Sequence, residues 1–171
     1  GDNTIRILQR GNPVLKGDEV SPAFPSVITS KAAVIPEDYK TSKSSGRRRA
    51  LAEWITSKEN PATARVMVNR IWQHHFGRGI VRSTSDFGCQ GNLPTHPKLL
   101  DWLAVRFMES DWDIKDLHKL IMTSQAYRRS STPSDECFEQ DPLNDLLWRF
   151  DMRRLGAEEI RDSVLAAKGT I

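Results

Sequence analysis

GRRRALAEWITSKENPATARVMVNRIWQHHFGRGIVRSTSDFGCQGNLPTHPKLLDWLAVRF, residues 46–107, is the stretch that decides the fold. Its apolar residues recur at intervals of three and four, which is typical of helices with one buried face. Asn60 and Pro61 predict a helix start, because asparagine caps free amides and proline fits the first helical position. The apolar stripe of this helix runs on to Phe76, and Gly77 is a natural stop.

The sequence on both sides of this helix continues the helical pattern. A first helix is expected before it, with an apolar face formed by residues 50, 51, 54 and 55. Residues 130–142 read as a polar linker. Further helices are expected after caps at Thr95 and Asp113, over residues 143–150, and over residues 157–168.

Residues 78–94 are rich in glycine and have no helical period, which predicts a long loop. Such a loop exceeds the usual connection of about 4–6 residues, and long loops often carry function. We expect Asp86 to hold it in place by pairing with Arg70, Arg78 or Arg82.

Residues 1–45 are predicted to be an extended arm. Ile5 to Leu8 favour a short strand, Lys16-Gly17-Asp18 a turn, and Pro22, Pro25 and Pro36 exclude a long helix. The fold class is therefore mostly α: a compact multi-helix domain (46–171) with an extended N-terminal arm (1–45) and one long glycine-rich loop.

Composition limits the function classes. The 171 residues carry 25 Lys and Arg against 22 Asp and Glu, a net charge of +3, and only residues 47–49 form a dense basic cluster, which does not favour a nucleic-acid partner. No apolar run approaches the roughly 18 residues of a membrane helix. The two cysteines, Cys89 and Cys137, allow one disulfide at most, and the sequence leaves their pairing open.

The candidate polar cluster lies on and beside the long loop and consists of Arg70, His75, Arg78, Asp86 and His96. A network of arginine–carboxylate pairs that locks the helices together is the favoured interpretation, and a pocket for an anionic ligand is the alternative. Adjacent His74 and His75 point about 100° apart on a helix, so no metal site is expected. Tryptophans 54, 72 and 102 lie on or beside apolar stripes and are expected to be core residues.

Several long motifs resemble a family of planctomycete-type domains of unknown function. The segments that carry the resemblance are NPATARVMVNRIWQHHFGRGIV (60–81), STSDFG (83–88), PTHPKLLDWLA (94–104), LHKLIMTSQAYR (117–128) and RRLGAEEIRDSVLA (153–166). They occur in the order of the family and cover nearly the whole chain.

The resemblance implies a domain at the C-terminal end of large bacterial envelope proteins, many of which begin with a cytochrome c-like domain. It implies an extracytoplasmic location, other domains of the same protein as partners, and a c-type haem only in a separate domain, with no cofactor in this chain. Because the family usually continues past the last helix, the chain is expected to be a fragment of the family domain.

Two functions follow as expectations. The first is a non-catalytic helical module that mediates interdomain or partner contacts, and it is favoured because no catalytic motif is complete. The alternative is a ligand-binding or hydrolytic domain for an anionic or carbohydrate substrate, with its site near residues 75–97. Convergence of the candidate polar residues around a concave pocket would favour the alternative.

Overall fold

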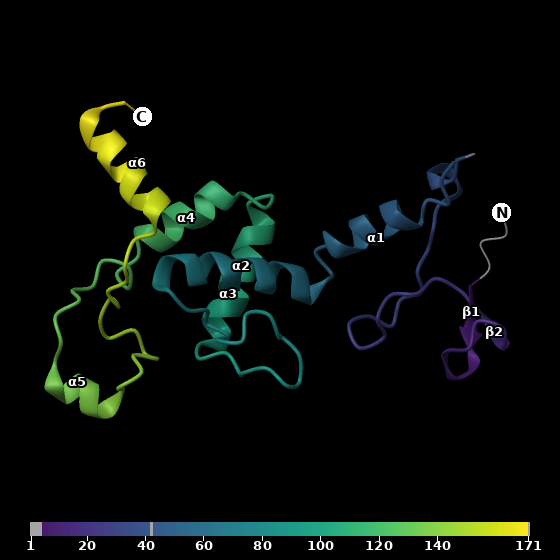
Figure 1. The fold of residues 1–171 in the computed structure, drawn as a ribbon, viewed down its shortest axis with the longest axis horizontal. Helices are drawn as coiled ribbons and strands as arrows, with labels where there is room; N and C mark the ends of the chain where they lie inside the picture. Colours follow the sequence, from purple (N-terminus) through teal and green to yellow (C-terminus); the bar gives the residue numbers. More distant parts are fainter. Residues whose placement is uncertain (1–4, 42, 171) are drawn as a thin grey trace. The chain divides into compact units, whose positions relative to one another are not determined.

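The structure is a computed structural model that describes residues 5–41 and 43–170 (Figure 1). Its elements in chain order are β1 (Ile5–Leu8), η1 (Gln9–Gly11), β2 (Lys16–Val20), η2 (Glu37–Tyr39), α1 (Arg47–Ile55), α2 (Pro61–Phe76), α3 (Pro97–Glu109), α4 (Ile114–Met122), α5 (Asp135–Gln140) and α6 (Ala157–Lys168). The predicted fold class, mostly α with an extended N-terminal arm, is confirmed. The chain divides into two compact units, residues 1–63 and 64–171. The predicted division between residues 45 and 46 stays a prediction.

The first unit begins with an antiparallel hairpin in which Ile5 pairs with Val20 and Leu8 pairs with Lys16. The prediction of a turn at residues 16–18 is therefore wrong, because these residues belong to β2. The chain reverses earlier, where Arg10 and Gly11 adopt positive φ angles of 51° and 75°. This early reversal sends residues 16–20 back along β1.

The rest of the first unit is held by aromatic contacts around α1. The ring of Phe24 stacks on Trp54 with centroids 4.6 Å apart. The Tyr39 hydroxyl donates to both carboxylate oxygens of Glu53, at 2.7 and 2.6 Å. Gly46, with φ of 72°, lies so close to Tyr39 that an added Cβ would be 2.7 Å from the tyrosine Cβ. Glycine is thus required at the start of α1.

The second unit contains the hydrophobic core, built by α2, α3, α4 and the first part of the long loop. Its buried members are Val68, Ile71, Trp72, Phe76, Ile80, Val81, Leu100, Leu103, Phe107, Leu117 and Ile121. The prediction of α2 is confirmed at both ends: Asn60 Oδ1 accepts from the Ala62 N–H at 3.0 Å, and Gly77, with φ of 79°, follows the last turn. Asp113 caps α4 as predicted, accepting from the backbone N–H groups of residues 115 and 116.

Three expectations about the second unit are wrong. Thr95 does not cap α3: His96 occupies the cap position, and the Thr95 hydroxyl donates to the Ile80 carbonyl instead. The linker 130–142 contains the short helix α5. Residues 143–150 form no helix, because Asn144 and Leu147 adopt positive φ angles of 53° and 56°.

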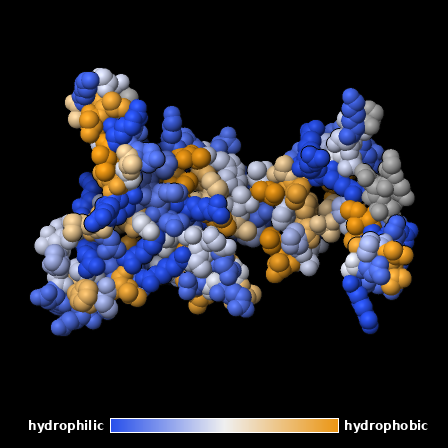
Figure 2. All heavy atoms as spheres, in the orientation of Figure 1, coloured by the Kyte–Doolittle hydropathy of each residue, from blue (hydrophilic) through white to orange (hydrophobic). Residues whose placement is uncertain are grey.

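Helix α6 has the predicted bounds, but its apolar stripe is uncovered. Ile160 and Val164 are 52% and 62% exposed, and none of the described residues of α6 is buried. Figure 2 shows hydrophobic surface, in orange, over this helix. No helix in the described ranges is long and apolar enough to cross a membrane.

Candidate functional site

The start of the long loop is anchored by Asn69, whose side chain is fully buried in α2. Its Nδ2 donates to the Val81 carbonyl at 2.9 Å, and its Oδ1 accepts from the Val81 N–H at 2.8 Å. Any Cβ at residue 79 would lie 2.6 Å from Asn69 Nδ2, which explains the glycine there. One amide side chain thus satisfies both polar backbone groups of a buried loop residue.

Two arginines join this loop to the segment after α5. Arg78 donates to an Asp151 carboxylate oxygen at 2.5 Å and to the Asn144 carbonyl at 3.2 Å. Arg82 pairs with Asp145. These side chains are only about one-third exposed, so the pairs are partly shielded from water. The favoured interpretation of the arginines as a structural network fits these contacts.

The segment 141–151 is shaped by its own polar side chains. The Asp141 carboxylate accepts from the backbone N–H groups of Asp145 and Leu146 at 2.9 and 2.8 Å. Burial acts to raise the pKa of Asp141, but these two hydrogen bonds lower the pKa overall. Asn144, which is also buried, donates to the Arg149 carbonyl and accepts from the Arg149 N–H.

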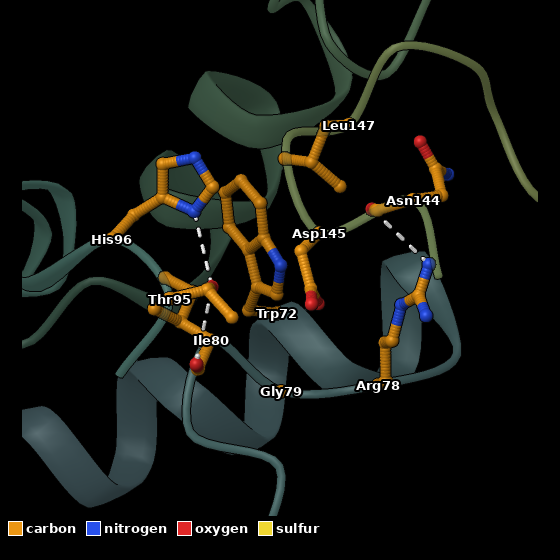
Figure 3. A pocket seen from close by; sticks show the side chains of 9 residues that line it. All are labelled: Trp72, Arg78, Gly79, Ile80, Thr95, His96, Asn144, Asp145 and Leu147. Carbon is orange, nitrogen blue, oxygen red and sulfur yellow. Dashed lines mark hydrogen bonds between the residues drawn. The ribbon is translucent and has the colours of Figure 1, made fainter. Parts of the chain in front are cut away.

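A small recess lies between the loop and this segment (Figure 3). It has a volume of only about 10 Å³ and is lined by Trp72, Arg78, Gly79, Ile80, Thr95, His96, Asn144, Asp145 and Leu147. Two of the predicted site residues, Arg78 and His96, line the recess from opposite sides (Figure 3). His96 lies beside the Trp72 indole, and its Nδ1 is 3.0 Å from the Thr95 hydroxyl (Figure 3).

The other three predicted site residues do not line the recess. Arg70 is exposed on α2. Asp86 pairs with none of the predicted arginines in the described ranges, and its carboxylate accepts from the Gly88 N–H at 3.0 Å. The expectation for Asp86 is wrong because Arg78 pairs with Asp151 and Arg82 pairs with Asp145, both far along the sequence.

His75 belongs to a separate cluster between α2 and α4. Its Nε2 lies 2.7 Å from Nδ1 of His118, and the Tyr127 ring stands edge-on to it, with centroids 5.5 Å apart. Burial lowers the pKa of His75, and the neighbouring positive charges of His118, Arg153 and His74 act in the same direction. This pair is a half-buried contact between helices.

A larger concave feature is an apolar groove with a volume of about 510 Å³. The apolar groove is lined by Trp72, His96, Leu99, Trp102, Leu103, Leu120, Ile121, Thr123, Ser124, Ala126, Arg129, Leu146 and Leu147. Trp72 is buried at its base, whereas Trp102 is 54% and Leu146 is 71% exposed. The expectation that Trp102 is a core residue is therefore wrong. The groove shares Trp72, His96 and Leu147 with the recess.

The residues that sequence reasoning missed are Asn69 and Asn144, whereas Trp102 was named but assigned to the core instead of the groove. Asn69 interrupts the apolar stripe three residues before Trp72, and an amide on a buried face usually has a backbone partner, so a signal was present. Asn144 gave no such signal, since its role depends on a turn that periodicity does not reveal.

In the described part of the chain, no group of three or more His, Cys, Asp or Glu side chains is placed to hold a metal ion. Cys89 is exposed, Cys137 is half-buried, and the two form no disulfide in the structure.

Comparison with known proteins gives one match. Residues 47–171, most of the chain, match the family described as "Protein of unknown function (DUF1553)". No curated protein and no solved structure matches the chain.

Proposed function

The chain belongs to this family of proteins of unknown function, and from that premise we propose that it is a helical docking module whose apolar groove receives a segment of another domain or protein. The observation that carries the proposal is the groove itself. Its volume of about 510 Å³ lies within the range of about 300–1,000 Å³ that is typical of binding sites, and its lining is mainly apolar with a few polar side chains.

The exposure of Trp102 supports the same function. Tryptophan is enriched among the residues that dominate binding energy at protein interfaces. Here Trp102 lies half exposed beside Leu99 and Leu103, on the wall of a cavity rather than alone on a convex surface. An exposed apolar surface of this kind is typical of a site that a partner covers.

The alternative, a substrate pocket near residues 75–97, has weaker geometric support. Only Arg78 and His96 of the five predicted residues line the recess, and the Arg78 guanidinium is already engaged by Asp151 and Asn144. Their recess has a volume of about 10 Å³, against about 510 Å³ for the groove. A docking role therefore uses more of the observed surface.

The setting of the module is part of the proposal. The resemblance to planctomycete-type domains supports an extracytoplasmic protein in which the partners are other domains of the same chain, one of them cytochrome c-like. Separation of envelope and cytoplasmic fractions of the native host, followed by detection of the protein, tests the location. Recovery in the cytoplasmic fraction alone would contradict it.

Site-specific photo-crosslinking in the full-length protein tests the docking function. A benzophenone amino acid is placed at residue 102 or 146 in the groove, and at exposed Glu139 on α5 as the control. We expect crosslinks from positions 102 and 146 to map by mass spectrometry to one common segment, and position 139 to give none to that segment. Equal or absent crosslinking at all three positions would refute a docking groove.

A further inference from the structure

We propose that the occupant of the apolar groove is an amphipathic α-helix with acidic residues beside its apolar face, held by Arg129. This inference rests on the proposed docking function and names the chemistry of the partner. It depends on three observations: the charge of the lining, the free donors of Arg129, and the helical construction of the walls.

The lining of the groove is electrically one-sided. Among the described residues that form it, Arg129 is the single formally charged side chain, and no carboxylate is present. His96 is the other basic side chain. Asp145 is the acidic residue next to the groove residues Leu146 and Leu147 in the sequence, and its carboxylate forms an ion pair with Arg82. A partner with carboxylates therefore meets a complementary charge, and a partner with amines meets none.

Arg129 has donors available for such a partner. Its guanidinium makes one hydrogen bond in the described structure, from Nη1 to the Trp148 carbonyl at 3.2 Å, and the residue is exposed. A guanidinium carries five N–H donors in a planar fork that matches a carboxylate. Arg129 can thus hold its place on Trp148 and still bind an incoming carboxylate with its remaining donors.

The walls of the groove favour a helix over an extended peptide. One wall is the face of α3 with Leu99, Trp102 and Leu103, and the other is the end of α4 around Leu120 and Ser124. Residues spaced by three and four on such helices form ridges, and the ridges of another helix pack into the grooves between them. The described residues of the second unit, 64–170, contain no strand, so an extended peptide would find no sheet edge to pair with.

Binding of designed peptides to the chain tests this inference. The probe is a synthetic amphipathic peptide of about 18 residues, roughly five helical turns, with leucines on one face and glutamates beside it. The matched peptide has lysine in place of every glutamate. We expect the dissociation constant of the acidic peptide to be lower than that of the basic peptide by about tenfold or more. Binding is measured by the change in tryptophan fluorescence. The difference between the two peptides is expected to shrink as salt is added.

Variants assign the effect to the groove. Arg129→Gln is expected to abolish the preference for the acidic peptide, and Trp102→Ala to weaken binding of both peptides. Arg128→Gln is the matched control, because this exposed neighbour does not line the groove, and it is expected to keep the preference. Circular dichroism checks that the variants fold, which the exposure of all three side chains favours.

Several outcomes would overturn the inference. Equal affinity for the acidic and basic peptides, or the same loss in Arg128→Gln as in Arg129→Gln, excludes recognition by Arg129. If decanoate saturates the groove and neither peptide binds, the groove is a site for a small amphiphile. If the chain forms a dimer in solution that the Trp102→Ala change dissociates, the occupant is a second copy of the chain. Crosslinks from residue 102 without peptide binding would refute the acidic helix and leave the docking function standing, whereas absent crosslinks refute the docking function.

Discussion

Buried Asn69 is the residue on which the geometry of the long loop depends most directly. Its amide supplies the acceptor and the donor for Val81. The Asn69→Ala change would leave two buried backbone groups unpaired, at about 1–3 kcal/mol each. We therefore expect the free energy of unfolding, measured by urea titration, to fall by roughly 2–6 kcal/mol.

The control for this prediction is Arg70→Ala, at the exposed neighbour that sequence reasoning had chosen for the site. A surface change of this kind is expected to alter the free energy of unfolding by less than about 0.5 kcal/mol. Similar losses in the two variants would show that the loop is not held by the Asn69 amide.

His75 makes the stability depend on pH. Its folded-state pKa is lowered from the ordinary value of about 6.5, so the unfolded chain binds a proton that the folded chain resists. The contribution of His75 to the free energy of unfolding should be fully present above about pH 6.5. It should decrease as the pH falls below this value, by at most about 1.4 kcal/mol per pH unit. The measurement is the urea midpoint at several pH values between 8 and 5.

Comparison with His75→Gln isolates this contribution, since the glutamine does not titrate. The variant should lose part of the decrease below pH 6.5, whereas His74→Gln, at the exposed neighbour, should retain it. An unchanged pH profile in His75→Gln would assign the dependence to other groups.

Single residues also show how far the site was predictable. Arg78 and His96 could be singled out because basic side chains beside a long loop suggest a polar cluster. That Arg78 meets Asp151, 73 residues later, could not be predicted, because periodicity gives no information on which distant segments meet. The groove was likewise hidden: a helical stripe containing Trp102 shows which face is apolar, but not whether another element covers it.

Among the elements, α4 is the helix whose cap is best defined. Asp113 Oδ1 accepts from the Lys115 and Asp116 N–H groups at 2.8 and 3.2 Å. The helix buries Leu117 and Ile121 in the core, so its end is linked to the global fold. We expect Asp113→Ala to lower the free energy of unfolding by about 0.5–2 kcal/mol in urea titrations.

Ser134→Ala removes the corresponding cap from α5 and serves as the comparison. That helix has no buried residue and is short, so loss of its cap should fray the helix locally. The global unfolding free energy is expected to change less than in Asp113→Ala. The reverse order would mean that α5 is coupled to the core.

The elements that could be predicted are those with a cap and a stripe in the sequence. For α2 these are Asn60, Pro61 and Gly77, and the prediction is confirmed to the residue. Residues 143–150 have apolar side chains at helical spacing, yet Asp141 and Asn144 bind their backbone and impose a different path. Local side-chain hydrogen bonds compete with helix formation in this way.

For the whole molecule, burial predicts a wide range of local stability. Helices α2, α3 and α4 contribute the core residues of the second unit, whereas α6 buries none of its described residues. An uncovered helix of 12 residues is marginal in water. Hydrogen–deuterium exchange should therefore show the slowest amides in α2–α4 and near-complete early exchange in α6.

Protection of α6 equal to that of α2 would contradict this prediction for the chain alone. The same experiment on a longer protein has a different expectation if a partner covers Ile160 and Val164. Protection of α6 would then rise without a change in α2.

The pairs made by Arg78 and Arg82 also have a consequence for biosynthesis. Their partners lie 63 to 73 residues later in the chain, a distance that a ribosome covers in roughly 3–15 s. A nascent chain stalled after residue 140 should leave Trp72 open to an added quencher, and one stalled far beyond residue 151 should shield it. The recess and the part of the groove formed by Leu146 and Leu147 are therefore completed on the ribosome only after helices α2, α3 and α4 have been made.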